Sequence, residues 1–260
     1  MKKILLIATL LLIATLLFAD RNKDNTTLSG ATKACNNGDA KECFTLGTIF
    51  DDERSFVKAA KFYLKACDAG YYDGCHSFGA MCDTGEGINK DSIKARKYYS
   101  KACDGGVTKG CFNLALQYYN GEGGNKDYIK ARKSFSKACH GNNYEGCLNL
   151  GYMYDDGLGG NKNSIKARKS YSKACDGGNA SGCFNLGILY NNGLGGNKDS
   201  IKARESYSKA CDAGNAKGCF NLGRMYYNGK GGNKDYIKAR KSFSKACDGG
   251  ISQGCKNLSL

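Results

Sequence analysis

Apolar residues recur along the chain with the spacing of one helix face. In the stretch that begins at Gly110, the residues Cys111, Leu114, Ala115 and Tyr118 lie at positions i, i+3, i+4 and i+7. This spacing places the four side chains on one stripe of an α-helix. A glycine-rich loop at 121–124 then interrupts the pattern. The pattern therefore predicts a helix that buries one face and ends at this loop.

A second helical pattern follows the loop. Asp127 is a typical N-cap residue, because its side chain can accept hydrogen bonds from the first free N–H groups of a helix. The predicted buried face of this helix consists of Tyr128, Ala131, Phe135, Ala138 and Cys139. No segment alternates apolar and polar residues over several positions, so the sequence predicts no strands.

This pair of helical patterns repeats, and cysteines mark the period. Fourteen cysteines form seven pairs with seven residues between partners, and the first members lie 32 residues apart once and 36 thereafter. The pairs are Cys35 and Cys43, Cys67 and Cys75, Cys103 and Cys111, Cys139 and Cys147, Cys175 and Cys183, Cys211 and Cys219, and Cys247 and Cys255. Helix–loop–helix units of this length predict an all-α fold, an α-solenoid superhelix whose units bury their faces on their neighbours.

One period carries a family resemblance. Residues 182–214 read GCFNLGILYNNGLGGNKDSIKARESYSKACDAG and resemble a Sel-like repeat, a relative of the tetratricopeptide repeat. The matching residues are Leu186, Gly187, Tyr190, Gly193, Gly195, Asp199, Lys202, Ala203, Tyr207, Lys209 and Ala210. The cysteine pairs further resemble the Hcp-type branch, whose members are exported, disulfide-bridged bacterial proteins classed as β-lactam-binding proteins and weak β-lactamases.

The chain departs from the family pattern in two places. Gly124, Gly160, Gly196 and Gly232 stand where an apolar residue is usual, as Ile88 does in one unit. We expect these glycines to loosen the loop without threatening the fold. The first unit is also four residues short, because 51–54 replace the glycine-rich loop.

The N-terminus has the pattern of a secretory signal peptide. Two lysines precede an apolar run at 4–19, and a small residue, Ala19, stands before a polar stretch. An uncleaved anchor is the alternative, because the run approaches the roughly 18 residues that span a bilayer.

The expected organisation is a signal peptide at 1–19, a lead-in or capping segment at 20–34, and at 35–260 a single solenoid of about six 36-residue units with a partial C-terminal helix. The mature chain is expected to be secreted or periplasmic, monomeric and without a transmembrane span.

The amino-acid composition limits the roles that the cysteines can have. The chain of 260 residues has 15 cysteines, which does not fit a reducing cytosol unless the thiols bind a metal. It has no C-x-x-C motif, and its two histidines, His76 and His140, stand alone. Reactive thiols would not be copied in every repeat. Structural disulfides are therefore favoured, and no metal or cofactor is expected.

The ends of the chain favour one disulfide pairing. Bridges from each pair to the next would leave Cys35 and Cys255 without partners, whereas bridges across the seven-residue gap leave none. Each such bridge closes a loop of about nine residues and is worth about 2.5 kcal/mol in the chain-entropy model. Cys82 is the odd cysteine and stands where other repeats have tyrosine, for example Tyr118. We predict a free, buried thiol, with intermolecular pairing or reactivity as alternatives.

The resemblance implies β-lactam chemistry, but the sequence assigns it to no residue. The S-x-x-K motif occurs at Ser55, Ser134, Ser170, Ser206 and Ser242, which looks like repeat sequence rather than one activated serine. The companion S-D-N and K-T-G motifs are missing, as are G-x-S-x-G and a zinc cluster. We predict no catalytic residue.

Two surfaces could bind a partner. On the first helix, a polar row of Asn113, Asn149, Asn185 and Asn221 lies beside a variable row of Leu116, Tyr152, Ile188 and Arg224. If the units stack as tetratricopeptide repeats do, these rows line a concave groove. Asparagine both donates and accepts hydrogen bonds, so the polar row could hold a peptide backbone. The alternative is that these asparagines cap turns or face water.

The second helices carry a row of lysines. The positions of Lys58, Lys61 and Lys65 repeat along the chain as lysine, with Glu205 as the exception. The formal net charge is +15. This row could attract an anionic surface, although a solvated outer face is the simpler interpretation. Nucleic acid is an unlikely partner, because the row lacks arginines and interleaved aromatics.

Together these patterns predict an exported, disulfide-stapled scaffold. Its expected ligand is a protein, a peptide or a cell-wall-derived, peptidoglycan-like molecule bound in the groove. The alternative is a β-lactam-binding protein with weak β-lactamase activity, which the resemblance alone implies.

Overall fold

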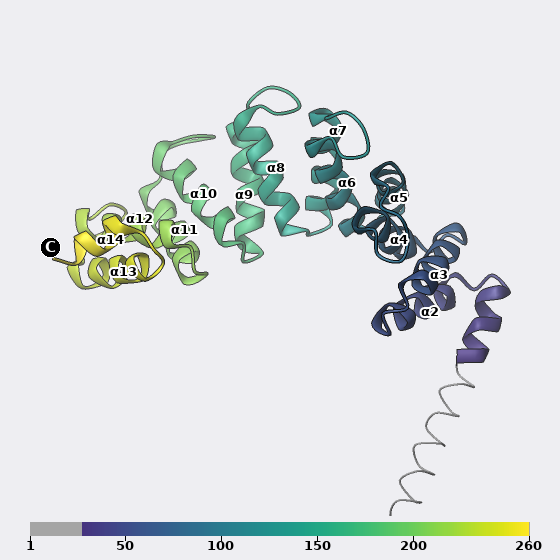
Figure 1. Ribbon diagram of the computed structural model, residues 1–260. Helices are drawn as coiled ribbons and strands as arrows, with labels where there is room; N and C mark the ends of the chain where they lie inside the picture. The colour runs from purple at the N-terminus through teal and green to yellow at the C-terminus, as the bar shows by residue number, and fades with distance from the viewer. Residues whose placement is uncertain (1–27, 260) are drawn as a thin grey trace, which may run out of the picture. The chain divides into compact units, whose positions relative to one another are not determined.

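The computed structural model describes residues 28–259, and within this range it contains helices and no strand (Figure 1). A helix at 28–36 comes first. The helices that follow are α2 (Ala40–Asp52), α3 (Phe56–Asp68), α4 (Tyr72–Thr84), α5 (Ser92–Asp104), α6 (Thr108–Asn120), α7 (Tyr128–His140), α8 (Tyr144–Asp156), α9 (Ser164–Asp176), α10 (Ala180–Asn192), α11 (Ser200–Asp212), α12 (Ala216–Asn228), α13 (Tyr236–Asp248), α14 (Ser252–Lys256) and the 3₁₀ turn η1 (Asn257–Ser259). The predicted all-α solenoid of helix pairs is confirmed.

The chain forms two compact units, one ending at Val107 and the other beginning at Thr108. The predicted signal peptide at 1–19 lies outside the described residues. Within residues 28–259, no helix has both the length and the apolar character needed to cross a bilayer.

Most of the described helices begin at a polar side chain that caps them, whereas α3, α4 and α14 have no side-chain cap. Asp127, Asp199 and Asp235 precede second helices and accept a hydrogen bond from the backbone N–H three residues later, at 2.9 Å in each case. Asn179 and Asn215 precede first helices and accept in the same way from Gly182 and Gly218, each at 2.8 Å. These caps satisfy N–H groups that have no partner inside the helix, which explains the regular helix starts.

The helices form two layers in the second unit. Successive first helices contact each other, as α8 does with α10 and α10 with α12, and the second helices α9 and α11 do the same. The core between the layers contains the predicted residues Ala131, Phe135, Ala138 and Cys139, all buried. Tyr118 and Tyr128 are only half-buried, so the predicted stripes were too wide at their ends.

The sequence patterns missed two buried positions. The sixth residue after the first-helix cysteine is buried as Met153, Leu189 and Met225, and as Gln117 in α6. The serine before the second-helix aromatic residue is also buried, as in Ser206. Gln117 and the serines are polar, which explains why a search for apolar periodicity missed them, whereas Met153, Leu189 and Met225 are apolar and simply lie outside the predicted stripe.

At a close contact between the two helices of a pair, most repeats have glycine. A Cβ atom on Gly187 of α10 would lie 2.6 Å from the Tyr207 ring of α11. Without a side chain at this position, the aromatic ring can pack against the backbone of α10.

The glycines expected to loosen the loops have another role. Gly196 has a φ of +146°, and a Cβ atom there would lie 2.6 Å from the guanidinium of Arg168 in the preceding repeat. Arg168 Nε donates to the Leu194 carbonyl at 3.1 Å, and its guanidinium lies 4.5 Å from the centre of the Tyr190 ring. Gly160 and Gly232 have the same conformation and face Arg132 and Arg204. Glycine thus makes room for an arginine that holds the loop.

Disulfides join each second helix to the next first helix. The bonded pairs with their Cα–Cα distances are Cys35–Cys43 (4.7 Å), Cys67–Cys75 (4.5 Å), Cys139–Cys147 (4.5 Å), Cys175–Cys183 (4.4 Å), Cys211–Cys219 (4.4 Å) and Cys247–Cys255 (4.7 Å). Cys103 and Cys111 are disulfide-bonded as well. One bridge per repeat was predicted, and the structure has it.

Candidate ligand-binding groove

The predicted asparagine row lies on the first helices, and its members are half-buried. Asn149 Nδ2 donates to the Glu145 carbonyl of its own helix at 2.9 Å, so this side chain is used locally. Asn185 differs, because its Nδ2 is buried and has no hydrogen-bond partner among the described residues. The row therefore combines local bonds, as at Asn149, with a buried donor at Asn185 that has no partner among the described residues.

Part of both predicted rows meets at one hollow between α10 and α12. Ile188, Asn221 and Arg224 line this hollow of about 230 Å³, together with Asn191 and Asn228. Asn113, Asn149, Asn185, Leu116 and Tyr152 do not line it. The row of variable side chains is open to solvent at two points, since Tyr152 is 41% exposed and Arg224 is also exposed.

The floor of the hollow includes a buried tyrosine. Tyr207 of α11 lines it and is 4% exposed. Burial raises the pKa of Tyr207 to about 12, while a hydrogen bond from Asn221 and the charge of Arg224 act in the opposite direction. At neutral pH the hollow thus presents a neutral phenol, several amides, the guanidinium of Arg224 and the ammonium of Lys230, a set that suits peptide amides and a carboxylate.

Sequence reasoning missed Tyr207, Asn191 and Asn228 as lining residues. Tyr207 carries the aromatic pattern of the core, which hides its second role at the hollow. Asn191 and Asn228 lie near the ends of their helices, where repeat sequence and loop sequence meet. The recurring asparagines at these ends were the available signal.

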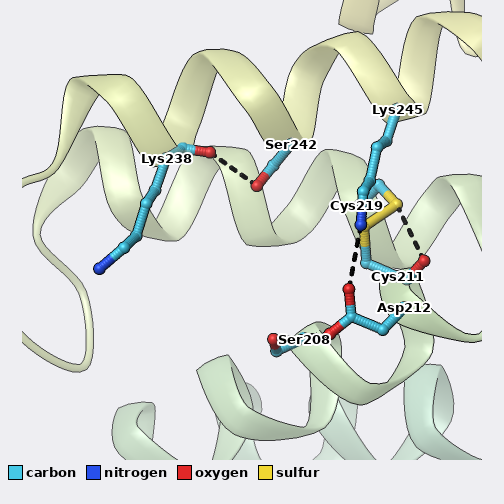
Figure 2. Close-up of polar contacts among 7 residues, drawn as sticks. All are labelled: Ser208, Cys211, Asp212, Cys219, Lys238, Ser242 and Lys245. Atoms are coloured by element: carbon cyan, nitrogen blue, oxygen red, sulfur yellow. Dashed lines mark hydrogen bonds and ion pairs between the residues drawn. A yellow bond between two sulfur atoms is a disulfide. The ribbon is translucent and has the colours of Figure 1, made fainter.

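Four of the five S-x-x-K serines are structural, and the fifth, Ser55, is half-buried at the start of α3. Ser134, Ser170, Ser206 and Ser242 are all buried. The hydroxyls of Ser170, Ser206 and Ser242 donate to the main-chain carbonyl four residues earlier, at 2.9, 2.7 and 2.8 Å. Figure 2 shows this bond for Ser242 and Lys238. A hydroxyl held in this way satisfies the helix backbone, as serine in a helix interior often does.

The lysine row is partly neutralised by acids of the same face. At the start of the second helices, Lys94, Lys130, Lys202 and Lys238 each lie 3.2–3.7 Å from the capping aspartate. Near the end, Lys101, Lys209 and Lys245 pair with the last aspartate of the preceding second helix, at 3.5, 3.5 and 3.0 Å. Figure 2 shows the pair between Lys245 and Asp212. The row is therefore less positive than the lysines alone predict.

Cys82 is free and fully buried. Burial raises the pKa of its thiol, and the charge of Asp91 acts in the same direction. The thiolate is the reactive form of cysteine, so this environment makes Cys82 a packing residue.

Comparison with known proteins identifies the repeat. The Sel1 repeat pattern matches six successive segments, 40–71, 74–107, 108–143, 145–179, 180–215 and 216–251. The chain belongs to the Sel1 repeat family. The search of curated proteins found no match to the chain.

Solved structures of Sel1 repeat proteins resemble this chain. A protective antigen with this fold, from uropathogenic Escherichia coli strains, is 28% identical with a TM-score of 0.81, over 89% of this chain and 50% of its own. The chain thus spans half the length of that antigen. A Sel1 repeat protein from Oxalobacter formigenes is 25% identical with a TM-score of 0.69, over 84% of this chain and 86% of its own. The cysteine-rich protein B of Helicobacter pylori is 39% identical over 50% of this chain and 94% of its own, with a TM-score of 0.41.

Proposed function

We propose that this Sel1 repeat protein is an exported scaffold that binds an extended peptide segment of a partner protein along its first helices. The hollow between α10 and α12 carries the proposal, because Asn221 of the constant row and the variable residues Ile188 and Arg224 line it together. Amides can bond a peptide backbone of any sequence, while the variable side chains select among sequences.

Export is the second part of the proposal. Disulfides persist in oxidising compartments, so a bridge in every repeat indicates an environment outside the cytoplasm. The signal-peptide pattern at 1–19 would direct the chain there, with cleavage after Ala19.

The test is selection from a random peptide library displayed on phage, with the oxidised protein as bait. Peptides that enter the hollow should carry an acidic residue opposite Arg224, because a guanidinium binds a carboxylate with two parallel hydrogen bonds. Arg224→Glu should lose these peptides by about tenfold or more and select basic ones instead. Lys241→Glu, on the outer side of α13, is the matched control and should leave the selection unchanged. Peptides retained equally by wild type and Arg224→Glu would contradict the proposal.

The β-lactam alternative lacks comparable support. Three of the S-x-x-K serines bond the main chain, and none of them lines the hollow between α10 and α12. A chromogenic cephalosporin incubated with the purified protein tests this alternative. Turnover that survives replacement of Ser55, Ser134, Ser170, Ser206 and Ser242 by alanine would require a different nucleophile.

A further inference from the structure

A second hollow lies on the other layer of helices, between α7 and α9. Its volume is about 390 Å³, within the range of small-molecule pockets. Leu150 and Tyr154 of α8 give it an apolar wall, and His140, Lys166, Lys169 and Lys173 give it basic groups. No aspartate or glutamate lines it.

The first reason for this positive charge is the replacement of an aspartate at the end of α7. Asp68, Asp176 and Asp212 end α3, α9 and α11, and each pairs with a lysine of the next second helix. At the same position α7 ends in His140. Lys173 Nζ instead donates to the His140 main-chain carbonyl at 3.3 Å. Lys173 is half-buried, whereas the paired Lys101, Lys209 and Lys245 are exposed. Lys173 therefore has no carboxylate partner and is also less exposed to solvent than its equivalents.

The second reason is the replacement of an aspartate at the start of α9. Asp91, Asp127, Asp199 and Asp235 cap the other second helices of this type and form an ion pair with the lysine three residues later. In α9 the cap is Asn163, which still accepts a hydrogen bond from the Lys166 backbone N–H at 2.9 Å. The amide keeps the cap but removes the charge. Lys166 Nζ lies over the Tyr154 ring, 5.5 Å from its centre.

Both replacements remove an acidic partner from a lysine of α9, and both lysines line the same hollow. Helices α5, α11 and α13 keep both ion pairs, whereas α9 has neither. Helix α3 also lacks acids at the two positions, which are Ser55 and Asn36. There, however, Lys65 Nζ donates to the Asn36 side chain at 2.8 Å and Lys58 Nζ lies 5.0 Å from the centre of the Phe50 ring. In α9, Lys166 and Lys173 also contact a ring and a carbonyl oxygen, but with Lys169 and His140 they line an open hollow.

The imidazole of His140 is held in position. Its Nδ1 donates to the Ser136 carbonyl at 2.7 Å, which leaves Nε2 for another partner. His140 is exposed at the edge of the hollow, so a ligand can reach it.

We propose that this hollow binds a small organic anion that has an apolar body. The oxyanion lies among Lys166, Lys169, Lys173 and His140, where several positive charges lack an acidic partner. The apolar body lies against Leu150 and Tyr154. Several lysines around one site favour a compact oxyanion, because each ammonium acts as a point charge. This site is independent of the peptide groove, since different helices and different residues form it.

Binding of 2-naphthoate to the full oxidised chain, measured by isothermal titration calorimetry at low ionic strength, tests the proposal. One equivalent should bind, and the affinity should fall as salt is added. The neutral 2-naphthalenemethanol keeps the apolar body, and inorganic phosphate keeps only the charge. Both should bind at least tenfold more weakly. Equal binding of the neutral compound would overturn the role of the lysines, and equal binding of phosphate would overturn the role of the apolar wall.

Two variants that restore the common repeat residues provide the decisive test. His140→Asp gives Lys173 the carboxylate that Lys209 and Lys245 have, and Asn163→Asp gives Lys166 the carboxylate that Lys202 has. Each should weaken 2-naphthoate binding about fivefold or more. Both residues occur at these positions in neighbouring repeats, so the variants should keep the helical circular dichroism and the disulfides. Unchanged affinity in folded variants would overturn the proposal.

The neighbouring repeat allows the site to be built anew. Leu186 and Tyr190 correspond to Leu150 and Tyr154, and Lys202 and Lys209 correspond to Lys166 and Lys173. The two sites differ in charge because Asp176, Asp199 and Glu205 stand where the first site has His140, Asn163 and Lys169. The triple variant Asp176→His, Asp199→Asn, Glu205→Lys should therefore bind two equivalents of 2-naphthoate. A variant that still binds one equivalent would show that the missing acids do not create the site.

Discussion

The first and second helices of a repeat differ in how freely their sequences vary. Helices α9 and α11 read SIKARKSYSKACD and SIKARESYSKACD, a difference of one residue. Their partners α8 and α10 read YEGCLNLGYMYDD and ASGCFNLGILYNN, which share mainly the cysteine, an asparagine, a leucine and glycines. One layer of the solenoid is thus nearly copied from repeat to repeat, and the other is not.

The contacts explain this difference. The second helices carry much of the bonding between repeats, including the ion pair from Lys245 to Asp212 and the hydrogen bond from Arg168 to the loop at Leu194. A change at these positions disturbs two repeats at once. Ile188 and Arg224 of the first helices line an open hollow, where a change affects only what binds there. The copied layer maintains the array, and the variable layer is the one suited to recognition.

The largest expected effect comes from cutting the covalent link between the layers. Cys175→Ala with Cys183→Ala removes one bridge that closes a loop of about nine residues, so the free energy of unfolding should fall by about 2.5 kcal/mol. Urea unfolding monitored by circular dichroism measures this loss. The matched control is the terminal bridge Cys247–Cys255, whose partners are less buried and which should cost less when removed. Equal losses at both bridges would show that burial of the bridge has no influence.

Within a repeat, the contact between the two helices gives the next largest effect. Gly187→Ala places a methyl group against Tyr207 and should cost about 1–2 kcal/mol, because overpacking forces side chains or backbone to move. The same urea titration measures it. Gly223→Ala is the matched control, because its aromatic partner is Phe243, and α6 already carries Ala115 at this position opposite Phe135.

We expect the larger loss for Gly187→Ala. The Tyr207 hydroxyl is held by Asn221, whereas a phenylalanine ring has no such bond and can shift. A greater loss for Gly223→Ala would contradict this reading of the contact.

The fold could be predicted from the sequence because its signals recur in every repeat. The cysteine spacing, the capping aspartates and the alanine-rich stripe of the second helix each occur several times, so chance agreement is excluded. The burial of Ser206 and of Gln117 could not be predicted, because a polar side chain is buried only when a specific partner satisfies it. For Ser206 this partner is the carbonyl of Lys202, a contact that periodicity does not encode.

The candidate sites were only partly predictable for a related reason. Ile188, Asn221 and Arg224 could be placed on one helix face, but the hollow that they line also depends on how α10 approaches α12. The second hollow is positively charged because two positions, 140 and 163, lack the aspartate that other repeats have there. In the sequence His140 stands out only as a solitary histidine, and no pattern singles out Asn163. Their common effect on Lys173 and Lys166 becomes visible when α7, α8 and α9 are seen packed together.

The smallest expected effect concerns the charge of a second-helix cap. Asp235 accepts from the Lys238 backbone N–H, and this hydrogen bond, followed by the attraction of the Lys238 ammonium, lowers the pKa of the Asp235 carboxyl. A carboxyl whose pKa is lower in the folded chain stabilises the fold above its unfolded pKa. This stabilisation is lost as the pH falls from about 4 through the lower folded value.

Asp235→Asn should behave like Asn163, which caps α9 without a charge. Thermal unfolding of the variant should therefore match wild type closely at neutral pH and depend less on pH between about 4 and 2. A variant that loses stability with acid as steeply as wild type would show that the charge of this cap contributes nothing beyond its hydrogen bond.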